Sequence, residues 1–309
     1  MIPEASSIAG HVDIIFWSLV GLSVIIMAIV GALVLTFAIR YREGTKAYRG
    51  PLPEIMSREF EISWTASTLF VALFIFWWAA SSQIPQFIIP KKALEIHVVA
   101  KQWMWKVQHP DGVREINALH VPLGKSVKLV MTSQDVIHSF GVPAFRIKQD
   151  VLPGRYTSTW FKATELGDFH LFCMEYCGTD HSRMLGTIVV MKPADYARWL
   201  ATQPHHEDLA GEGARLFTAL GCSGCHGPSA RVPAPSLVGL YGREVALADG
   251  DTVTADEDYL RTSIMRPEAQ VTAGYQPVMP AYQGVASEEQ VVALIAYIKS
   301  MKAGRSQMR

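Results

Sequence analysis

Two long apolar runs stand near the start of the chain, separated by a polar loop. Residues 14–39 and 62–82 contain no Asp, Glu, Lys or Arg. At about 1.5 Å per residue, a helix over the first run is long enough to cross a hydrocarbon core of about 30 Å. We therefore predict a hairpin of two membrane spans within residues 1–92. A cleaved signal sequence is the alternative for the first run, but no basic segment precedes it.

Basic residues gather in the loop between the two runs. This loop contains Arg40, Arg42, Lys46, Arg49 and Arg58, whereas residues 1–13 contain no Lys or Arg. The positive-inside rule therefore puts the loop in the cytoplasm. The N-terminus and everything after residue 90 are then expected on the external or periplasmic side.

The pattern changes to that of a β domain over residues 93–192. Short β-branched segments bounded by turn residues predict strands; they include residues 94–100, 126–132 and 185–191. Their spacing favours a sandwich or barrel.

A helical pattern follows a polar connection. Residues 193–209 form this linker, with a short helix expected inside it, and residues 210–309 are expected to form a helical domain. Its last helix begins at Ser287, where Gln290 completes a capping box. The apolar face of this helix follows helical spacing and contains Val291, Leu294, Ile295 and Ile298.

Charge counts exclude one class of function and suggest an internal contact. The chain has 28 basic and 28 acidic residues, without the basic excess of a nucleic-acid-binding protein. Residues 91–192 carry 13 basic and 9 acidic groups, whereas residues 193–309 carry 10 and 13. We expect the acidic helical domain to dock on the basic β domain. Four cysteines are too few for a disulfide framework.

The densest set of metal-ligating residues lies within the β domain. In order along the chain it comprises His138, Cys173, Cys177, His181 and Met184. Thiolates, imidazoles and a thioether together suit copper, and the second thiolate lets two copper ions share one site. A tetrahedral zinc site and a disulfide between the two cysteines are the alternatives.

A second motif lies in the helical domain. The sequence Cys222-x-x-Cys225-His226 is the attachment signature of c-type haem. The distal ligand is one of Met265, Met279, Met301 and Met308. We choose Met279 because it lies in an irregular Pro/Gly loop, with a buried core methionine as the alternative. His–Met ligation suits an electron carrier, and His205 and His206 in the linker are expected to be solvated.

Residues 10–192 resemble subunit II of cytochrome c oxidase, and residues 210–302 are similar to class I cytochromes c. The resemblance implies a cupredoxin-like barrel holding the binuclear copper A centre, followed by an all-α cytochrome c domain. It implies these roles: Cys173 and Cys177 bridge the coppers, His138 and His181 are terminal ligands, Met184 is a weak ligand, and Glu175 offers its backbone carbonyl. It also implies a magnesium ion held by the Glu175 side chain at the contact with subunit I.

The resemblance implies two further functional positions. Electrons would enter through Trp103, although Met104 stands where the family usually has Tyr; packing is the alternative for Trp103 and the preferred role for Trp105. Glu61, with Trp64, matches a carboxylate near the mouth of a proton channel. A solvated charge at the helix end is the alternative for Glu61.

We expect the chain to be the subunit through which electrons enter a respiratory cytochrome c oxidase, a proton-pumping oxidoreductase of the bacterial cytoplasmic membrane. Electrons would pass from haem c to copper A and then to subunit I, which reduces oxygen. Expected partners are subunit I and further oxidase subunits, the lipid membrane, and a donor that is cytochrome c or a quinol:cytochrome c reductase complex. The alternatives are a nitric oxide reductase subunit and a stand-alone membrane-anchored electron carrier.

Overall fold

The computed structural model describes residues 2–51, 54–203, 208–228, 230 and 232–301. It divides the chain into two compact units. One unit is Ile8–Ile89, and the other joins the residues before Ile8 to those from Pro90 onward. Each is described by itself.

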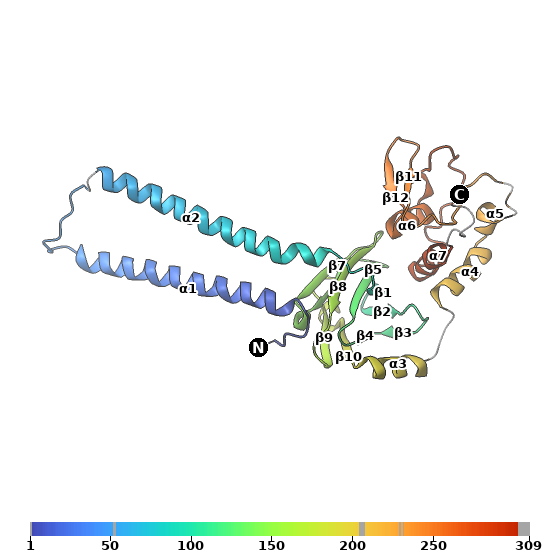
Figure 1. Cartoon of the computed structure of the whole chain (residues 1–309), viewed down its shortest axis with the longest axis horizontal. Coiled ribbons are helices and arrows are strands. Elements are labelled where there is room, and N and C mark those ends of the chain that lie inside the picture. Colours follow the sequence, from blue (N-terminus) through green and yellow to red (C-terminus); the bar gives the residue numbers. More distant parts are fainter. Residues whose placement is uncertain (1, 52–53, 204–207, 229, 231, 302–309) are drawn as a thin grey trace. The chain divides into compact units, whose positions relative to one another are not determined.

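The first unit is a pair of long helices (Figure 1). Helix α1 spans Ala9–Arg40 and α2 spans Glu54–Gln83, and the short 3₁₀ helix η1, Ile84–Phe87, follows. Both helices extend several residues beyond the predicted apolar runs, since polar end residues continue the helical hydrogen bonding. No residue in their most apolar windows is buried. Helices that are apolar all round and exposed fit a membrane protein.

Two five-stranded sheets form the β domain, in the orders β3-β2-β1-β5-β8 and β4-β10-β9-β6-β7. The strands are β1 Leu94–Lys101, β2 Met104–Gln108, β3 Arg114–Ile116, β4 Ala118–Pro122, β5 Ser126–Ser133, β6 His138–Val142, β7 Ile147–Val151, β8 Thr157–Lys162, β9 Gly167–Cys173 and β10 Leu185–Met191. The three predicted strands are confirmed to within one residue at each end. The two sheets form the expected cupredoxin-like architecture.

Strands β1 and β5 of the first of these sheets are buried on both faces. In β5, Val127 and Leu129 turn into the β core, whereas Val130 on the opposite face belongs to the same buried cluster as Val291 and Leu294 of the last helix. The helical region therefore covers the outer face of this sheet at β5. Burial on both faces explains why β1 and β5 are apolar almost throughout rather than alternating.

The described C-terminal residues form the α-helices α3 Pro193–Thr202, α4 Leu209–Ala219, α5 Ser223–His226, α6 Glu257–Met265 and α7 Glu288–Ser300, and the short 3₁₀ helix η4 Pro267–Ala269. The capping box at Ser287 is confirmed, and the four predicted face residues of α7 are buried. A two-stranded sheet, β11 Glu244–Ala246 with β12 Thr252–Thr254, adds strand to a domain expected to be all-α. Gly250, at φ +95°, supplies the turn between these β-branched segments.

Helix α3 packs back on the β domain. The Tyr196 hydroxyl lies 3.2 Å from His109 Nδ1, and the Trp199 ring stacks on the His120 ring with centroids 4.1 Å apart. The helix expected in the linker is thus tied to the β domain by aromatic contacts. His205 and His206 lie outside the described residues.

Candidate metal centres

Strand pairing brings the first two copper-type ligands together. Strands β6 and β9 are antiparallel neighbours, with Phe140 opposite Cys173. His138 begins β6 and Cys173 ends β9, so both side chains reach the same end of the sheet. His138 Nδ1 lies 3.9 Å from Cys173 Sγ. Both residues are buried.

The loop from β9 to β10 supplies the remaining ligands. Cys177 Sγ lies 3.7 Å from Cys173 Sγ, 3.5 Å from His181 Nδ1 and 3.9 Å from Met184 Sδ. The loop is fixed by its backbone, because the Cys173 N–H donates to the Met184 carbonyl at 3.2 Å. The Glu175 carbonyl oxygen lies 3.3 Å from Cys173 Sγ.

The donor set fits a pair of soft metal ions. His138, Cys173 and Cys177 offer ligand atoms that all lie within 4.8 Å of one another. A four-coordinate zinc ion would leave Met184 unused. Both cysteines are free, and their sulfurs are too far apart for a disulfide bond. The exposed Glu175 side chain leaves magnesium as a prediction.

A carboxylate lies behind the buried imidazole. Asp135 Oδ1 accepts a hydrogen bond from His138 Nε2 at 2.8 Å, which leaves Nδ1 facing the sulfurs. Burial alone would raise the pKa of Asp135, but hydrogen bonds donated by the Gln102 N–H and by His138 hold it below its usual range. Burial would likewise raise the pKa of the Cys173 thiol, and its hydrogen bond with His138 lowers it.

Trp103 lies against the copper-type loop. Its Nε1 donates to the Cys177 carbonyl at 3.2 Å, and the Gln102 amide donates to the same oxygen at 2.8 Å. Gly178, at φ +116°, allows this approach, because a Cβ there would come within 3.2 Å of the Trp103 ring. Trp105 is fully buried against Phe140, which agrees with packing as its preferred role.

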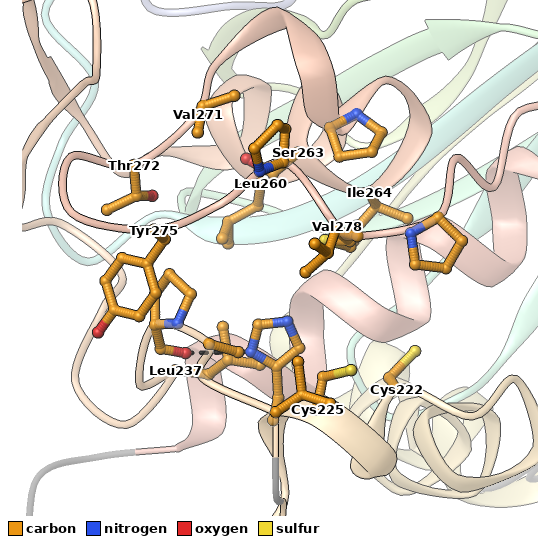
Figure 2. A pocket seen from close by; sticks show the side chains of 18 of the residues that line it. Cys222, Cys225, Leu237, Leu260, Ser263, Ile264, Val271, Thr272, Tyr275 and Val278 are labelled. Carbon is orange, nitrogen blue, oxygen red and sulfur yellow. Dashed lines mark hydrogen bonds between the residues drawn. The ribbon is translucent and has the colours of Figure 1, made fainter.

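The second motif borders a large apolar cavity. Cys222, Cys225, His226 and Met279 all line this cavity. In Figure 2, Cys222 and Cys225 lie on one side, and Leu260 and Ser263 lie on the other. Two buried oxygens in the lining, Ser263 Oγ and Gln270 Oε1, have no hydrogen-bond partner within the described part of the chain. An apolar cavity with a few unsatisfied polar atoms fits a large ring with polar substituents.

His226 is held in the tautomer that a metal ligand needs. Its Nδ1 lies 3.0 Å from the Pro235 carbonyl oxygen, which can only accept, so Nδ1 carries the proton. The other ring nitrogen, Nε2, is then free to bind iron.

The structure separates the candidate distal methionines. Met279 lines the cavity, and Met265 and Met301 are not among its lining residues. Met265 is buried in the helical core, and Met279 and Met301 both pack against that core. Met308 lies outside the described residues. The Met279 side chain is therefore the one of the three described candidates that borders the cavity holding His226.

Glu61 lies on α2 with an exposed side chain. Its carboxylate accepts a hydrogen bond from the Ser57 hydroxyl at 3.4 Å. This contact fits both a carboxylate near a channel mouth and a solvated charge at the helix end, so a role of Glu61 in proton uptake stays a prediction.

Charge pairs join the helical region to the β domain. Lys106 Nζ lies 2.7 Å from Glu289 Oε1. Lys128 Nζ lies 3.7 Å from Glu257 Oε1, and Arg114 pairs with Glu212. In all three the basic group belongs to the β domain, as the charge counts led us to expect. In a fourth pair the acidic group belongs to the β domain instead: Lys299 Nζ lies 2.7 Å from Glu95 Oε1.

The sequence did not direct attention to Asp135 or to Gln102. Asp135 stands three residues before His138, and a carboxylate near a metal-binding histidine is a usable signal. Gln102 gave no such signal, because its contact with Cys177 joins residues 75 positions apart.

Two family descriptions match the chain. Residues 113–192 match "Cytochrome C oxidase subunit II, periplasmic domain", and residues 210–302 match "Cytochrome c". Both matches agree with the resemblance stated from the motifs.

Similar proteins carry corresponding names. Cytochrome c oxidase subunit 2 of Alkalihalophilus pseudofirmus is 29% identical, over 91% of this chain and 85% of the relative. Alternative cytochrome c oxidase subunit 2 of Bradyrhizobium diazoefficiens is 32% identical, over 42% of this chain and 58% of the relative. A solved periplasmic domain of oxidase subunit II from Bradyrhizobium japonicum is 35% identical, covering 38% of this chain and 96% of that one, with a TM-score of 0.36.

Proposed function

Because the chain belongs to the cytochrome c oxidase subunit II family and carries a fused cytochrome c domain, we propose that it is the subunit through which electrons enter a haem–copper oxidase. With both groups bound, electrons would pass from a donor to haem c, then to copper A, and then to the catalytic subunit that would reduce oxygen. The observation that carries this proposal is that two electron-transfer ligand sets lie in one compact unit.

The proposed ligands are those that the geometry gathers. The side chains of His138, Cys173, Cys177, His181 and Met184 and the carbonyl of Glu175 would hold copper A. Cys222 and Cys225 would attach haem c, and His226 and Met279 would bind its iron. When bound, each centre takes up and releases one electron at a time.

The residues around these ligands hold them in place. Asp135 fixes the His138 ring so that Nδ1 faces the thiolates. Trp103, through its contact with the Cys177 carbonyl, is the proposed residue through which electrons reach the copper site. Four of the proposed copper ligands, His138, Cys173, Cys177 and Met184, are buried, which excludes water and limits reorganisation around the metal.

The proposed location is the bacterial cytoplasmic membrane, with both soluble domains on its external side. The segment before α1 supports this side, since the Ala5 N–H donates to the Ala144 carbonyl and Ala5 accepts from Thr164. Both outer ends of the hairpin therefore join the same soluble unit. Proposed partners are subunit I, which shares a magnesium ion at Glu175, and a donor that is cytochrome c or a quinol:cytochrome c reductase complex. Proton pumping, with Glu61 near a channel mouth, belongs to the assembled complex.

The test follows reduction of the copper centre by rapid mixing of the full oxidase with its reduced donor. Met279→Leu keeps the side-chain volume but removes the distal sulfur, so copper reduction should slow. Met265→Leu, in the core, is the matched control and should leave the rate unchanged. An unchanged rate in both Met279→Leu and His226→Ala would overturn the route through haem c.

A further inference from the structure

A short loop between β5 and β6 touches the copper ligands on one side. This loop, residues 134–137, begins after Ser133 and ends at the ligand His138. Asp135 Oδ1 accepts from His138 Nε2 at 2.8 Å, and its Oδ2 accepts from the Gln102 N–H at 2.7 Å. Gln102 in turn donates to the Cys177 carbonyl at 2.8 Å. One carboxylate thus connects both halves of the copper ligand set.

The same loop touches the cytochrome c domain on its other side. Gln134 Nε2 donates to Glu289 Oε2 at 2.7 Å. Lys106 Nζ donates to Glu289 Oε1 at 2.7 Å and lies 3.3 Å from Gln134 Oε1. These three side chains form a closed triangle across the domain boundary. The charged members are about 30% exposed (32% and 28%), so water screens the triangle only in part.

Glu289 is a rigid point of attachment. It lies in the first turn of α7, within the capping box formed by Ser287 and Gln290. Helix α7 is anchored in the domain core, with Val291, Leu294 and Ile295 each at most 2% exposed. The Gln134 backbone is also fixed, since its N–H donates to the Ala100 carbonyl at 3.0 Å. Both ends of the Gln134–Glu289 contact are therefore held by ordered structure.

We propose that Glu289 of the cytochrome c domain is a positioning residue for the copper centre. By holding Gln134 it fixes the loop whose Asp135 orients the His138 imidazole and, through Gln102, the Cys177 carbonyl. This inference rests on the proposed copper A function. Groups behind a ligand set its orientation and basicity, so docking of the haem domain and geometry of the copper site are coupled. Such coupling is reciprocal between the two binding events.

The test uses the full chain in detergent, loaded with copper and haem. Two readouts are taken: the copper hyperfine pattern in electron paramagnetic resonance, and the retention of copper against a chelator. Asp135→Asn is the positive control and should weaken copper binding by about 10–100-fold. Glu289→Ala should change the hyperfine pattern and weaken retention in the same direction by a smaller factor.

Two further variants separate positioning from general docking. Glu212→Gln breaks the ion pair with Arg114 between the same two domains, away from the 134–137 loop, and should leave the copper signal unchanged. The double variant Gln134→Glu with Glu289→Gln exchanges the two side chains and keeps a carboxylate next to Lys106. This double variant should restore the copper hyperfine pattern of the parent protein.

Three results would overturn the inference: a parent-like copper signal in Glu289→Ala with its haem spectrum intact, an equal change in Glu212→Gln, or no recovery in the double variant. If Glu289→Ala fails to fold, recovery in the double variant decides. A parent protein that shows no two-copper signal would instead overturn the proposed function itself.

Discussion

The two candidate metal centres are built in different ways. The proposed copper ligands already touch one another, with Cys177 Sγ within 4 Å of Cys173 Sγ, His181 Nδ1 and Met184 Sδ. The proposed haem ligands lie on the walls of an apolar cavity. Strand pairing and loop hydrogen bonds assemble the first site, whereas the second leaves part of its domain core for the cofactor to fill.

This difference predicts opposite dependence of folding on the cofactor. The β domain has a complete apolar core between its two sheets, so its strands persist without metal. The cytochrome c domain exposes apolar side chains to its cavity, and an unfilled apolar cavity is costly. Folding of this domain should therefore be linked to haem attachment, as it is for other small domains completed by a bound group.

The largest expected effect comes from removing the attachment thiols. Cys222→Ser combined with Cys225→Ser should leave α4, α6 and α7 without protection in hydrogen exchange, because the cavity stays unfilled. Strands β1 and β5 of the same protein should stay protected. As the matched control, removing copper with a chelator should leave both regions protected. A protected α7 without haem would break the contrast between the two sites.

A buried ion pair should matter next most. Arg261, only 4% exposed, pairs with Glu288 and donates to the Gly154 carbonyl of the β domain. Arg261→Met leaves the Glu288 charge buried without its partner, so we expect a loss of about 3–5 kcal/mol in unfolding free energy of the cytochrome c domain. Thermal denaturation measures it, with exposed Arg266→Met as the control. If Arg261→Met lowered the free energy of unfolding by less than Arg266→Met, the buried ion pair would not stabilise the cytochrome c domain.

The β domain has its own buried charge, and it predicts a pH dependence. Burial alone would raise the pKa of Glu115, but hydrogen bonds with His109 and His120 lower it to about 2. Because this pKa lies below the unfolded value, the stabilisation, about 3 kcal/mol, is present above pH ~4.5 and is lost as the pH falls toward 2.

Urea denaturation of the parent protein and of Glu115→Gln at several pH values measures this stabilisation. The difference in free energy of unfolding should be largest at pH 6–7 and shrink on acidification. Asp168→Asn, at an exposed position of the same domain, is the control. A difference that does not change with pH would contradict the assignment of the stabilisation to the ionised carboxylate.

The smallest expected effect concerns the start of α7. Ser287→Ala removes the capping hydrogen bond to the Gln290 N–H and should cost about 1 kcal/mol. Exposed Ser300→Ala, at the other end of the helix, should cost less than about 0.5 kcal/mol. Equal costs would mean that core packing alone fixes where α7 begins.

Local chemistry made much of this molecule predictable. The spans, the metal motifs, the capped helix and the strands 94–100 and 126–132 are each specified by neighbouring residues. The contact of Gln134 with Glu289 joins residues 155 positions apart, and no local pattern encodes it. The packing of α3 on His120 also joins residues that are far apart in the sequence, so no local pattern predicts it. Met279 could be chosen as the distal haem ligand from a local signal, the Pro/Gly loop around it. Its position on the cavity wall depends on the fold of the whole domain.

The central claim is that one chain holds a two-copper centre and a His–Met haem. Spectroscopy of the full-length protein carrying both metals tests it most directly. We predict a multi-line copper hyperfine pattern together with a methionine–iron charge-transfer band that Met279→Leu abolishes. A signal from one isolated copper ion, bound zinc in its place, or a charge-transfer band that persists in Met279→Leu would contradict the claim.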